Sequence, residues 1–295
     1  MNSSPCQRIL FIVNPISGIG KQKGIEGALE QGIDKARFDY QVVYTEKPGH
    51  ATELSRKAAE EGMDIVVAVG GDGTVNETAT GLVGAETALG IIPTGSGNGL
   101  ARHLGIPMKI KQAVEIINQA KTMKIDTATL NDQVFVNVAG VGFDAYIARK
   151  FASSGKRGFS TYFKVTANAY KDYKPHKYTL TIDGKVVRRR ALLISFANSS
   201  QFGNNASIDP KASLDDGFID VCIVRKIPFW KTGFLAPLLF IKKFDQTRYE
   251  EIIPAKEAHL IWKKGKSIHV DGDPKKMGKE LVMKVNPLSL KVVTP

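Results

Sequence analysis

Strand-like and helix-like segments alternate regularly through the N-terminal part of this chain, and no other feature of the sequence constrains its fold as strongly. Short apolar runs typical of buried strands are separated by segments whose apolar residues recur at helical spacing. We expect strands at residues 8–13, 38–44, 64–69 and 88–92, and helices at residues 24–32, 51–61, 75–83, 100–104 and 110–119. This order predicts a parallel sheet with helices on both faces, which is a three-layer α/β domain.

The pattern changes after about residue 124, where strand-like stretches dominate. They lie at residues 127–130, 134–139, 178–182, 186–196, 219–224, 258–262 and 267–270, and one helical interlude spans residues 145–173. Asp183-Gly184 between two of these stretches is a hairpin signal. We therefore expect an α/β domain at residues 1–125 and a second, mostly antiparallel β domain at residues 126–281.

The chain is basic, with 41 Lys and Arg against 29 Asp and Glu and a net charge of +12. Such a surface attracts nucleic acids, anionic lipid headgroups and nucleotides, and composition does not choose among them. The two cysteines, Cys6 and Cys222, do not make a disulfide framework, and a reducing compartment fits them best. No apolar run is long enough to span a bilayer, so we expect a cytoplasmic protein that meets a membrane only peripherally.

The strongest chemical signal is the glycine-rich turn at residues 70–76, after a valine-rich strand and before a helix. Glycines let a phosphate approach the backbone, and the helix N-terminus offers free N–H groups. Asp72 would repel a bare phosphate, but its position is understandable if Mg²⁺ lies between them. The alternative is that Asp72 caps a helix. The residues that we expect to bind the phosphates here are Gly70, Gly71, Asp72, Gly73, Thr74 and Asn76.

Two further loops follow neighbouring strands of the predicted sheet. Residues 93–102 contain Gly95, Ser96 and Asn98, and residues 14–21 begin with Asn14. The latter loop is not a Walker P-loop, because Gln22 stands where Ser or Thr should bind the metal, and the chain has no complete G-x-G-x-x-G. Three such loops at strand ends predict one nucleotide-binding edge. The histidines at 103, 176, 259 and 269 lack metal-ligand spacing, and we expect them to be structural.

Together these residues resemble the diacylglycerol kinase catalytic-domain family, which includes bacterial lipid kinases and the sphingosine and ceramide kinases. The glycine-rich Asp loop is shared with NAD kinases, whereas the ordered set of motifs is specific to the lipid kinases. Besides the three loops, the motifs are Thr45-Glu46-x-Pro48-Gly49-His50-Ala51, Asn137-x₄-Gly142-Phe143-Asp144-Ala145, Asp215-Asp216-Gly217-x₂-Asp220 and Val270-Asp271-Gly272-Asp273.

The resemblance implies an NAD-kinase-like or diacylglycerol-kinase-like first domain, a β-sandwich second domain and a C-terminal segment, residues 282–295, that returns to the first. It implies ATP held by the glycine loops with Thr45 and Ser96. Asp271 would accept the proton of a lipid hydroxyl, as in other phosphoryl transfers. Asp273 replaces the usual Glu, which moves the carboxylate by ~1.5 Å. A second Mg²⁺ would lie near Asp216, aided by the backbone carbonyls around Ser213 and Phe218.

The expected partners are a lipid substrate and an anionic membrane surface, with no nucleic acid, while a homodimer stays open. Residues 229–243 combine aromatic and aliphatic side chains with lysines, as interfacial segments do, although a core helix is the alternative. Gly99 follows Asn98 as in the sphingoid kinases, so diacylglycerol and a sphingoid base both remain candidate substrates. Alternatives to a lipid kinase are an NAD kinase and a non-catalytic module that binds anionic lipid or nucleic acid.

Overall fold

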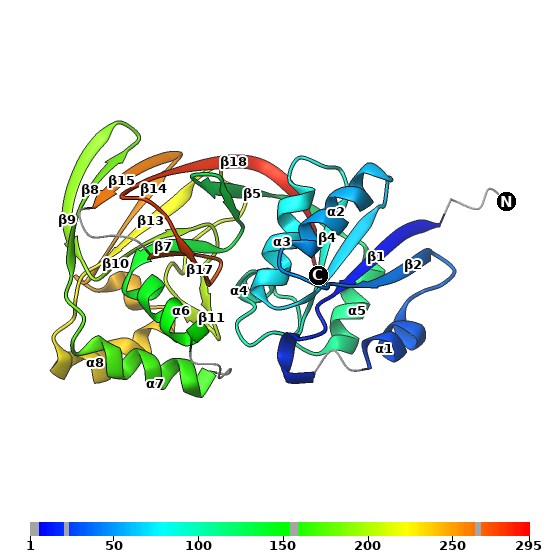
Figure 1. The fold of residues 1–295 in the computed structure, drawn as a ribbon, viewed down its shortest axis with the longest axis horizontal. Helices are drawn as coiled ribbons and strands as arrows, with labels where there is room; N and C mark the ends of the chain where they lie inside the picture. Colours follow the sequence, from blue (N-terminus) through cyan, green and yellow to red (C-terminus); the bar gives the residue numbers. More distant parts are fainter. Residues whose placement is uncertain (1–5, 21–23, 154–158, 263–266) are drawn as a thin grey trace. The chain divides into compact units, whose positions relative to one another are not determined.

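The computed structural model describes residues 6–20, 24–153, 159–262 and 267–295, and divides the chain into two compact units (Figure 1). Unit 1 contains Met1–Ile125 and Leu288–Pro295, and unit 2 contains Asp126–Pro287. Lys21 and Gln22 of the first loop and residues 154–158 of the helical interlude lie outside the described residues. Each unit is considered by itself.

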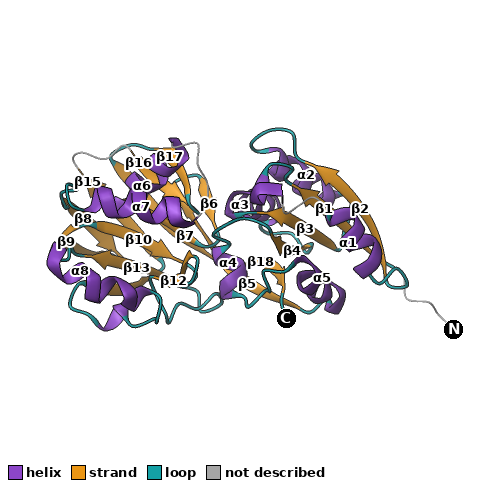
Figure 2. Cartoon of the chain, turned by 90° about the horizontal axis from the view of Figure 1, so that it is seen from below, coloured by secondary structure: helices purple, strands orange, loops and turns teal. Residues whose placement is uncertain are grey.

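Unit 1 is a parallel sheet between two layers of helices (Figure 2). Its strands run in the order β2-β1-β3-β4, and the end of β18 pairs with β4 in parallel through Val292 and Leu89. Helices α2 and α3 pack together on one face, and α1 and α5 on the other. The elements are β1 (Gln7–Val13), β2 (Phe38–Tyr44), β3 (Ile65–Gly70), β4 (Ala88–Pro93), α1 (Ile25–Gly32), α2 (His50–Glu60), α3 (Asp72–Leu82), α4 (Gly99–His103) and α5 (Ile110–Gln119).

Burial explains why these residues form central parallel strands. All residues of β3 and β4 are buried, and β1 is buried over its last five residues. Strands covered by helices on both faces have continuous apolar sequences rather than alternating ones. The predicted three-layer α/β fold is therefore confirmed.

Unit 2 consists of two packed antiparallel sheets. The first has the order β14-β13-β10-β7-β16-β17, and the second contains β15, β8, β9 and the first part of β18, with β5 and β6 paired beside it. The strands are β5 (Thr122–Leu130), β6 (Gln133–Phe135), β7 (Val138–Gly142), β8 (His176–Ile182), β9 (Lys185–Ala191), β10 (Leu193–Ala197), β13 (Ile219–Val224), β14 (Glu250–Ala255), β15 (Glu257–Trp262), β16 (Ser267–Val270), β17 (Asp273–Lys276) and β18 (Glu280–Val293). A short ribbon joins β11 (Gln201–Gly203) and β12 (Ala206–Ser207).

Alternating apolar residues of both sheets meet in one core, which includes Phe135, Leu180, Phe196, Val221 and Leu260. The opposite face of the first sheet is covered by a second cluster, to which α6 (Phe143–Ser153), α7 (Phe159–Tyr170) and α8 (Phe229–Leu235) contribute. The antiparallel β-sandwich is thus confirmed.

The element boundaries differ from the prediction where one apolar run serves two sheets. Residues 186–196 were expected to form one strand, but β9 pairs with β8 in one sheet and β10 pairs with β13 in the other. Leu192 lies at the transition and donates its N–H to the carbonyl of Val224 at 2.7 Å. An apolar run does not show where a strand leaves one sheet for another. Strand β14 and the short strand β17 were not predicted.

No helix in the described part of the chain is long and apolar enough to cross a bilayer.

Candidate active site

The three glycine-containing loops of unit 1 meet at the carboxyl edge of the sheet. Strands β1, β3 and β4 are parallel neighbours, so their following loops lie side by side. The N–H of Thr94 donates to the carbonyl of Gly70 at 2.9 Å. A Cβ on Gly95 would lie 2.5 Å from the Cα of Gly71, which shows how closely the two backbones pack. The prediction that these loops form one edge is confirmed.

The first loop is joined to the other two by side chains. Asn14 donates from its amide nitrogen to the hydroxyl of Thr74 at 3.0 Å. The hydroxyl of Ser17 lies 2.8 Å from that of Thr94. Gly18 has a positive φ of 64°, and a Cβ there would lie 2.1 Å from the carbonyl oxygen of Thr94, so a larger residue does not fit. Asn14 therefore positions the hydroxyl of Thr74 at the first turn of α3.

Asp72 begins α3 without a side-chain cap hydrogen bond there, so the alternative that it caps the helix after its turn is not supported. Its carboxylate accepts the N–H groups of Asn98 at 2.8 Å and Gly99 at 2.7 Å, at the start of the neighbouring helix α4. Burial raises the pKa of Asp72, and the two N–H donors oppose that shift. A Cβ on Gly97 would lie 2.5 Å from this carboxylate, so the glycine is required by the contact. Asp72 joins two loops, and its part in holding Mg²⁺ stays a prediction.

The groups at this edge are of the kind that bind phosphates, and the binding of ATP there stays a prediction. Gly71 and Gly95 leave bare backbone where they approach each other, while Gly73 and Ser96 are exposed. The first N–H groups of an α-helix have no carbonyl partner within the helix and complement negative charge, and α3 begins at this edge. Asn98 is buried with a left-handed φ of 54°, and its Oδ1 has no hydrogen-bond partner among the described residues. That oxygen is an acceptor available to a donor group of a nucleotide.

Thr45 follows β2, the outer neighbour of β1, and its N–H donates to the carbonyl of Val13 at 2.9 Å. The loop after it is held by Glu77 of α3, whose carboxylate accepts the N–H groups of Gly49 and Ala51 at 2.9 and 3.3 Å. Glu77 was not singled out from the sequence. The loop that follows β2 is thereby held against α3, the helix that begins in the turn at residues 70–76.

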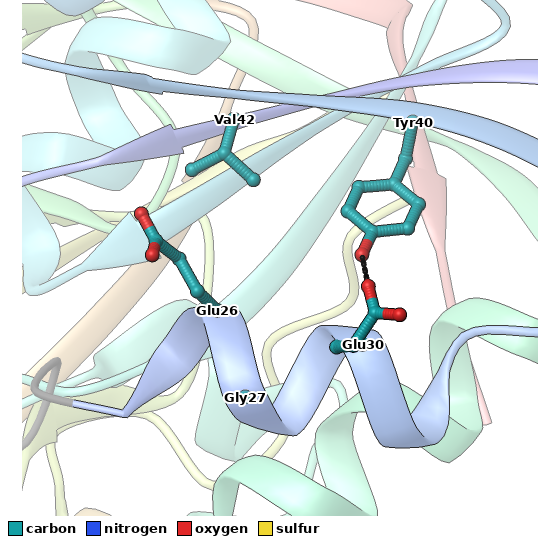
Figure 3. A pocket seen from close by; sticks show the side chains of 5 residues that line it. All are labelled: Glu26, Gly27, Glu30, Tyr40 and Val42. Carbon is teal, nitrogen blue, oxygen red and sulfur yellow. Dashed lines mark hydrogen bonds between the residues drawn. The ribbon is translucent and has the colours of Figure 1, made fainter.

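A hollow between α1 and β2 is a poor alternative site for a nucleotide (Figure 3). Glu26 and Glu30 line it, together with Gly27, Tyr40 and Val42. The hydroxyl of Tyr40 donates to Glu30 at 3.1 Å. Two carboxylates would repel a triphosphate, so the glycine edge is the better site.

In unit 2, Asp271 lies in the turn between β16 and β17 with a positive φ of 46°. Its side chain is buried, and its carboxylate accepts the N–H groups of Val136 at 3.0 Å, Asn137 at 2.9 Å and Val138 at 3.0 Å. These amides separate β6 from β7, which explains why the predicted strand 134–139 is broken. The carboxylate of Asp271 therefore holds the loop at residues 136–138 in place.

Asp273 differs from Asp271 in its access to solvent. It begins β17, its side chain is 56% exposed, and its carboxylate forms an ion pair with Lys275 at 2.9 Å. An exposed ion pair is weak, so this carboxylate is available to other partners. Of the two acids expected to be catalytic, Asp273 is the more accessible.

The loop expected to hold a second Mg²⁺ is ordered by its own hydrogen bonds. The carboxylate of Asp216 is exposed and accepts the N–H of Phe218 at 3.0 Å, while the hydroxyl of Ser213 donates to Asp215 at 2.7 Å. Buried Asp126, which sequence reasoning missed, accepts the N–H of Gly217 at 2.7 Å. In the described part of the chain no three acidic, histidine or cysteine side chains gather to hold a metal, so a site here would depend on backbone carbonyls.

A parallel sheet with interlocked glycine turns at its carboxyl edge, joined to an antiparallel sandwich, defines a nucleotide-dependent phosphotransferase. Comparison with known proteins identifies the family. Residues 8–130 match the diacylglycerol kinase catalytic domain, and residues 137–294 match the YegS C-terminal NAD kinase beta sandwich-like domain. The chain belongs to the diacylglycerol kinase catalytic-domain family and is an ATP-dependent lipid kinase.

The relatives agree in length as well as in sequence. The chain is 28% identical over 274 residues to the diacylglycerol kinase of Staphylococcus aureus (strain bovine RF122 / ET3-1), covering 90% of this chain and 86% of that protein. It is 27% identical over 268 residues to that of Staphylococcus carnosus (strain TM300). A crystal structure from Bacillus anthracis str. Sterne, provisionally described as a diacylglycerol kinase, superposes with a TM-score of 0.80 at 26% identity and covers 99% of this chain and 98% of its own.

Proposed function

We propose that this protein transfers the γ-phosphate of ATP to the free hydroxyl of diacylglycerol. The observation that carries the proposal is the convergence of the three loops around Asn14, Gly71 and Gly95 at one sheet edge, in a chain that matches named diacylglycerol kinases over nine-tenths of its length. The backbone N–H groups and hydroxyls of this edge bind and orient the triphosphate. A bound Mg²⁺ would supply charge neutralisation on the phosphates.

Asp273 is the proton acceptor in this proposal, and Asp271 holds its hairpin. The exposure of Asp273 supports the assignment, because a general base must reach the hydroxyl whose proton it takes. Asp271 is buried and its oxygens accept hydrogen bonds from three backbone amides, so its carboxylate is less accessible than that of Asp273. In this proposal Asp273 accepts the proton in place of Asp271, the base expected from the sequence, and the variants at the two positions described below separate the two assignments.

The test is transfer of labelled phosphate from ATP in the presence of Mg²⁺. Parallel reactions contain vesicles with diacylglycerol, vesicles with a sphingoid base, and NAD in solution. We expect label in an organic-extractable product whose mass is that of phosphatidic acid. Label only in the sphingoid product would overturn the proposed substrate, and label only in NADP would overturn lipid phosphorylation altogether.

We further propose that residues 229–243 contact an anionic bilayer. The alternative of a core helix is not supported, because residues 228–243 are all exposed or half-buried. Leu235, Leu238 and Leu239 pack against the apolar cluster beneath, while Trp230 is 72% and Phe234 is 82% exposed.

Charge in the same segment complements anionic lipid. The ammonium group of Lys231 lies 4.7 Å from the ring centre of Trp230, and Lys242 and Lys243 follow the apolar stretch. Aromatic side chains beside lysines are typical of interfacial segments, and each cation near an anionic leaflet contributes about 1 kcal/mol.

The remaining expectations concern location and assembly. Both cysteines are free, which supports the reducing environment of the cytoplasm. Residues 229–243, the docking segment, would hold the protein peripherally at the membrane. A homodimer stays a prediction, which sedimentation of the purified protein would check.

A further inference from the structure

A buried polar cluster joins α6 to strands β10 and β16 of the first sheet of unit 2, beside the hairpin of β16 and β17 that carries Asp271 and Asp273. Asp144 is in the first turn of α6, and its Oδ2 lies 3.0 Å from the hydroxyl of Ser195 and 3.0 Å from Nε2 of His269. Its Oδ1 accepts the N–H of Ala145 at 2.7 Å. The exposed fractions of Asp144, Ser195 and His269 are 9%, 0% and 5%. We infer that Asp144 and His269 are a positioning pair, which sets the place of the hairpin that carries Asp273.

The strand register places His269, Gly140 and Ser195 side by side on three adjacent strands. His269 pairs with Gly140 across β16 and β7, and Gly140 pairs with Ser195 across β7 and β10. Their sequence neighbours Ala139, Ile194 and Ile268 point into the sandwich core. Because successive residues of a strand face opposite sides of the sheet, Gly140, Ser195 and His269 face α6.

Gly140 leaves the space that the Asp144 carboxylate occupies. A Cβ on Gly140 would lie 2.6 Å from Oδ2 of Asp144 and 3.1 Å from Nε2 of His269. A side chain on the middle strand would therefore separate the pair. The Asp144 carboxylate lies over the backbone of Gly140, between the hydroxyl of Ser195 on β10 and Nε2 of His269 on β16.

The pair acts on Asp273 through strand pairing. His269 is the cross-strand partner of Pro274, and its neighbour Val270 is the partner of Asp273. Strand β17 is at the edge of its sheet and pairs with β16. A rotation or shift of β16 therefore moves Asp273 directly. Asp271 holds the turn to residues 136–138, and His269 holds the strand to α6, so the hairpin is restrained at two separate points.

The hydrogen bond also defines the form of the imidazole. A carboxylate can only accept, so Nε2 of His269 must carry the proton that it shares with Asp144. Its Nδ1 is buried and has no partner among the described residues. A glutamine at this position can place an amide N–H near the site of Nε2, whereas an asparagine places its amide near Nδ1. The two substitutions differ by one methylene and test the hydrogen bond rather than the loss of the ring.

The inference rests on the proposed function, and the experiment separates their failures. His269→Asn, His269→Gln and the wild-type enzyme are compared for kcat, for KM of ATP and of diacylglycerol in vesicles, and for Tm. We expect kcat of His269→Asn to fall at least about tenfold, as small misplacements of reacting groups do, with KM for ATP unchanged. His269→Gln should keep kcat within about threefold of wild type, and its Tm should lie above that of His269→Asn because it keeps the buried hydrogen bond to Asp144.

Equal kcat values for the two variants, or a wild-type kcat in His269→Asn, would overturn the positioning role. Absence of diacylglycerol phosphorylation by the wild-type enzyme would instead overturn the proposed substrate, and the comparison would then use the lipid that is phosphorylated. Should both His269 variants fail to fold, Ser195→Ala removes another donor to Asp144 by a change that creates little space. Its kcat should fall about threefold with KM for ATP unchanged, and an unchanged kcat overturns the inference.

Discussion

Replacing Gly95 by alanine should force the two glycine turns of unit 1 apart. The added Cβ would lie 2.5 Å from the Cα of Gly71 and 3.0 Å from Oδ1 of Asn98. Non-bonded carbon atoms rest about 3.5–4.0 Å apart, so the turns must separate by about 1 Å. Overpacking of this kind costs typically about 1–3 kcal/mol of unfolding free energy. The corresponding decrease in Tm is roughly 3–10 °C.

Gly73→Ala is the matched control, because it makes the same chemical change in the neighbouring turn. Gly73 is exposed, and a Cβ there would meet no atom within 4 Å. Thermal unfolding without ATP isolates the protein's own contacts, and only Gly95→Ala should lower Tm. In the kinase assay a displacement of 1 Å should lower kcat/KM for ATP by up to about hundredfold. Equal Tm values for the two variants would refute the close packing of the turns.

Three further predictions concern catalysis, the pH dependence of stability and membrane binding. Asp273→Asn should lower kcat by at least about hundredfold at an unchanged Tm. Asp271→Asn should lower Tm, because the single oxygen of an amide cannot accept three N–H groups as a carboxylate does. The opposite pattern would show that Asp271 is the base. Burial raises the pKa of Glu250 from 4.5 to about 8, so the folded state keeps a proton that the unfolded state releases. Stability should therefore fall as pH rises between these values, and Glu250→Gln should flatten the dependence of Tm on pH. Trp230→Ser should weaken sedimentation with anionic vesicles several-fold, whereas Val186→Ala, at a residue that is 61% exposed on β9, should not; equal binding of both would contradict the docking segment.

Acidic residues in turns proved hardest to interpret from the sequence. Asp72 and Asp271 both carry the pattern of an acid beside glycine, and both hold backbone N–H groups of a distant segment. A carboxylate that binds a metal and one that binds a loop have the same sequence pattern. The choice depends on which amides lie opposite, and these are 26 and 27 residues away for Asp72 and 133 to 135 residues away for Asp271.

His269 is a second case in which the sequence did not show the partner of a polar side chain. Without metal-ligand spacing it was expected to be structural, and no local pattern links it to Asp144, 125 residues earlier. A signal was nevertheless present, because Gly140 interrupts an apolar strand at the position that must stay empty. A glycine inside a strand often marks a close approach by another group.

Local periodicity and glycine placement were enough to establish the α/β architecture of this chain and the sheet edge at which its glycine-containing loops meet. They are encoded in short stretches, and parallel neighbouring strands bring their ends together whatever the details of packing. The environment of each carboxylate was not encoded locally. These environments depend on hydrogen-bond partners and solvent access that arise when distant segments pack, so only the folded protein shows that Asp271 is buried against three amides while Asp273 is exposed.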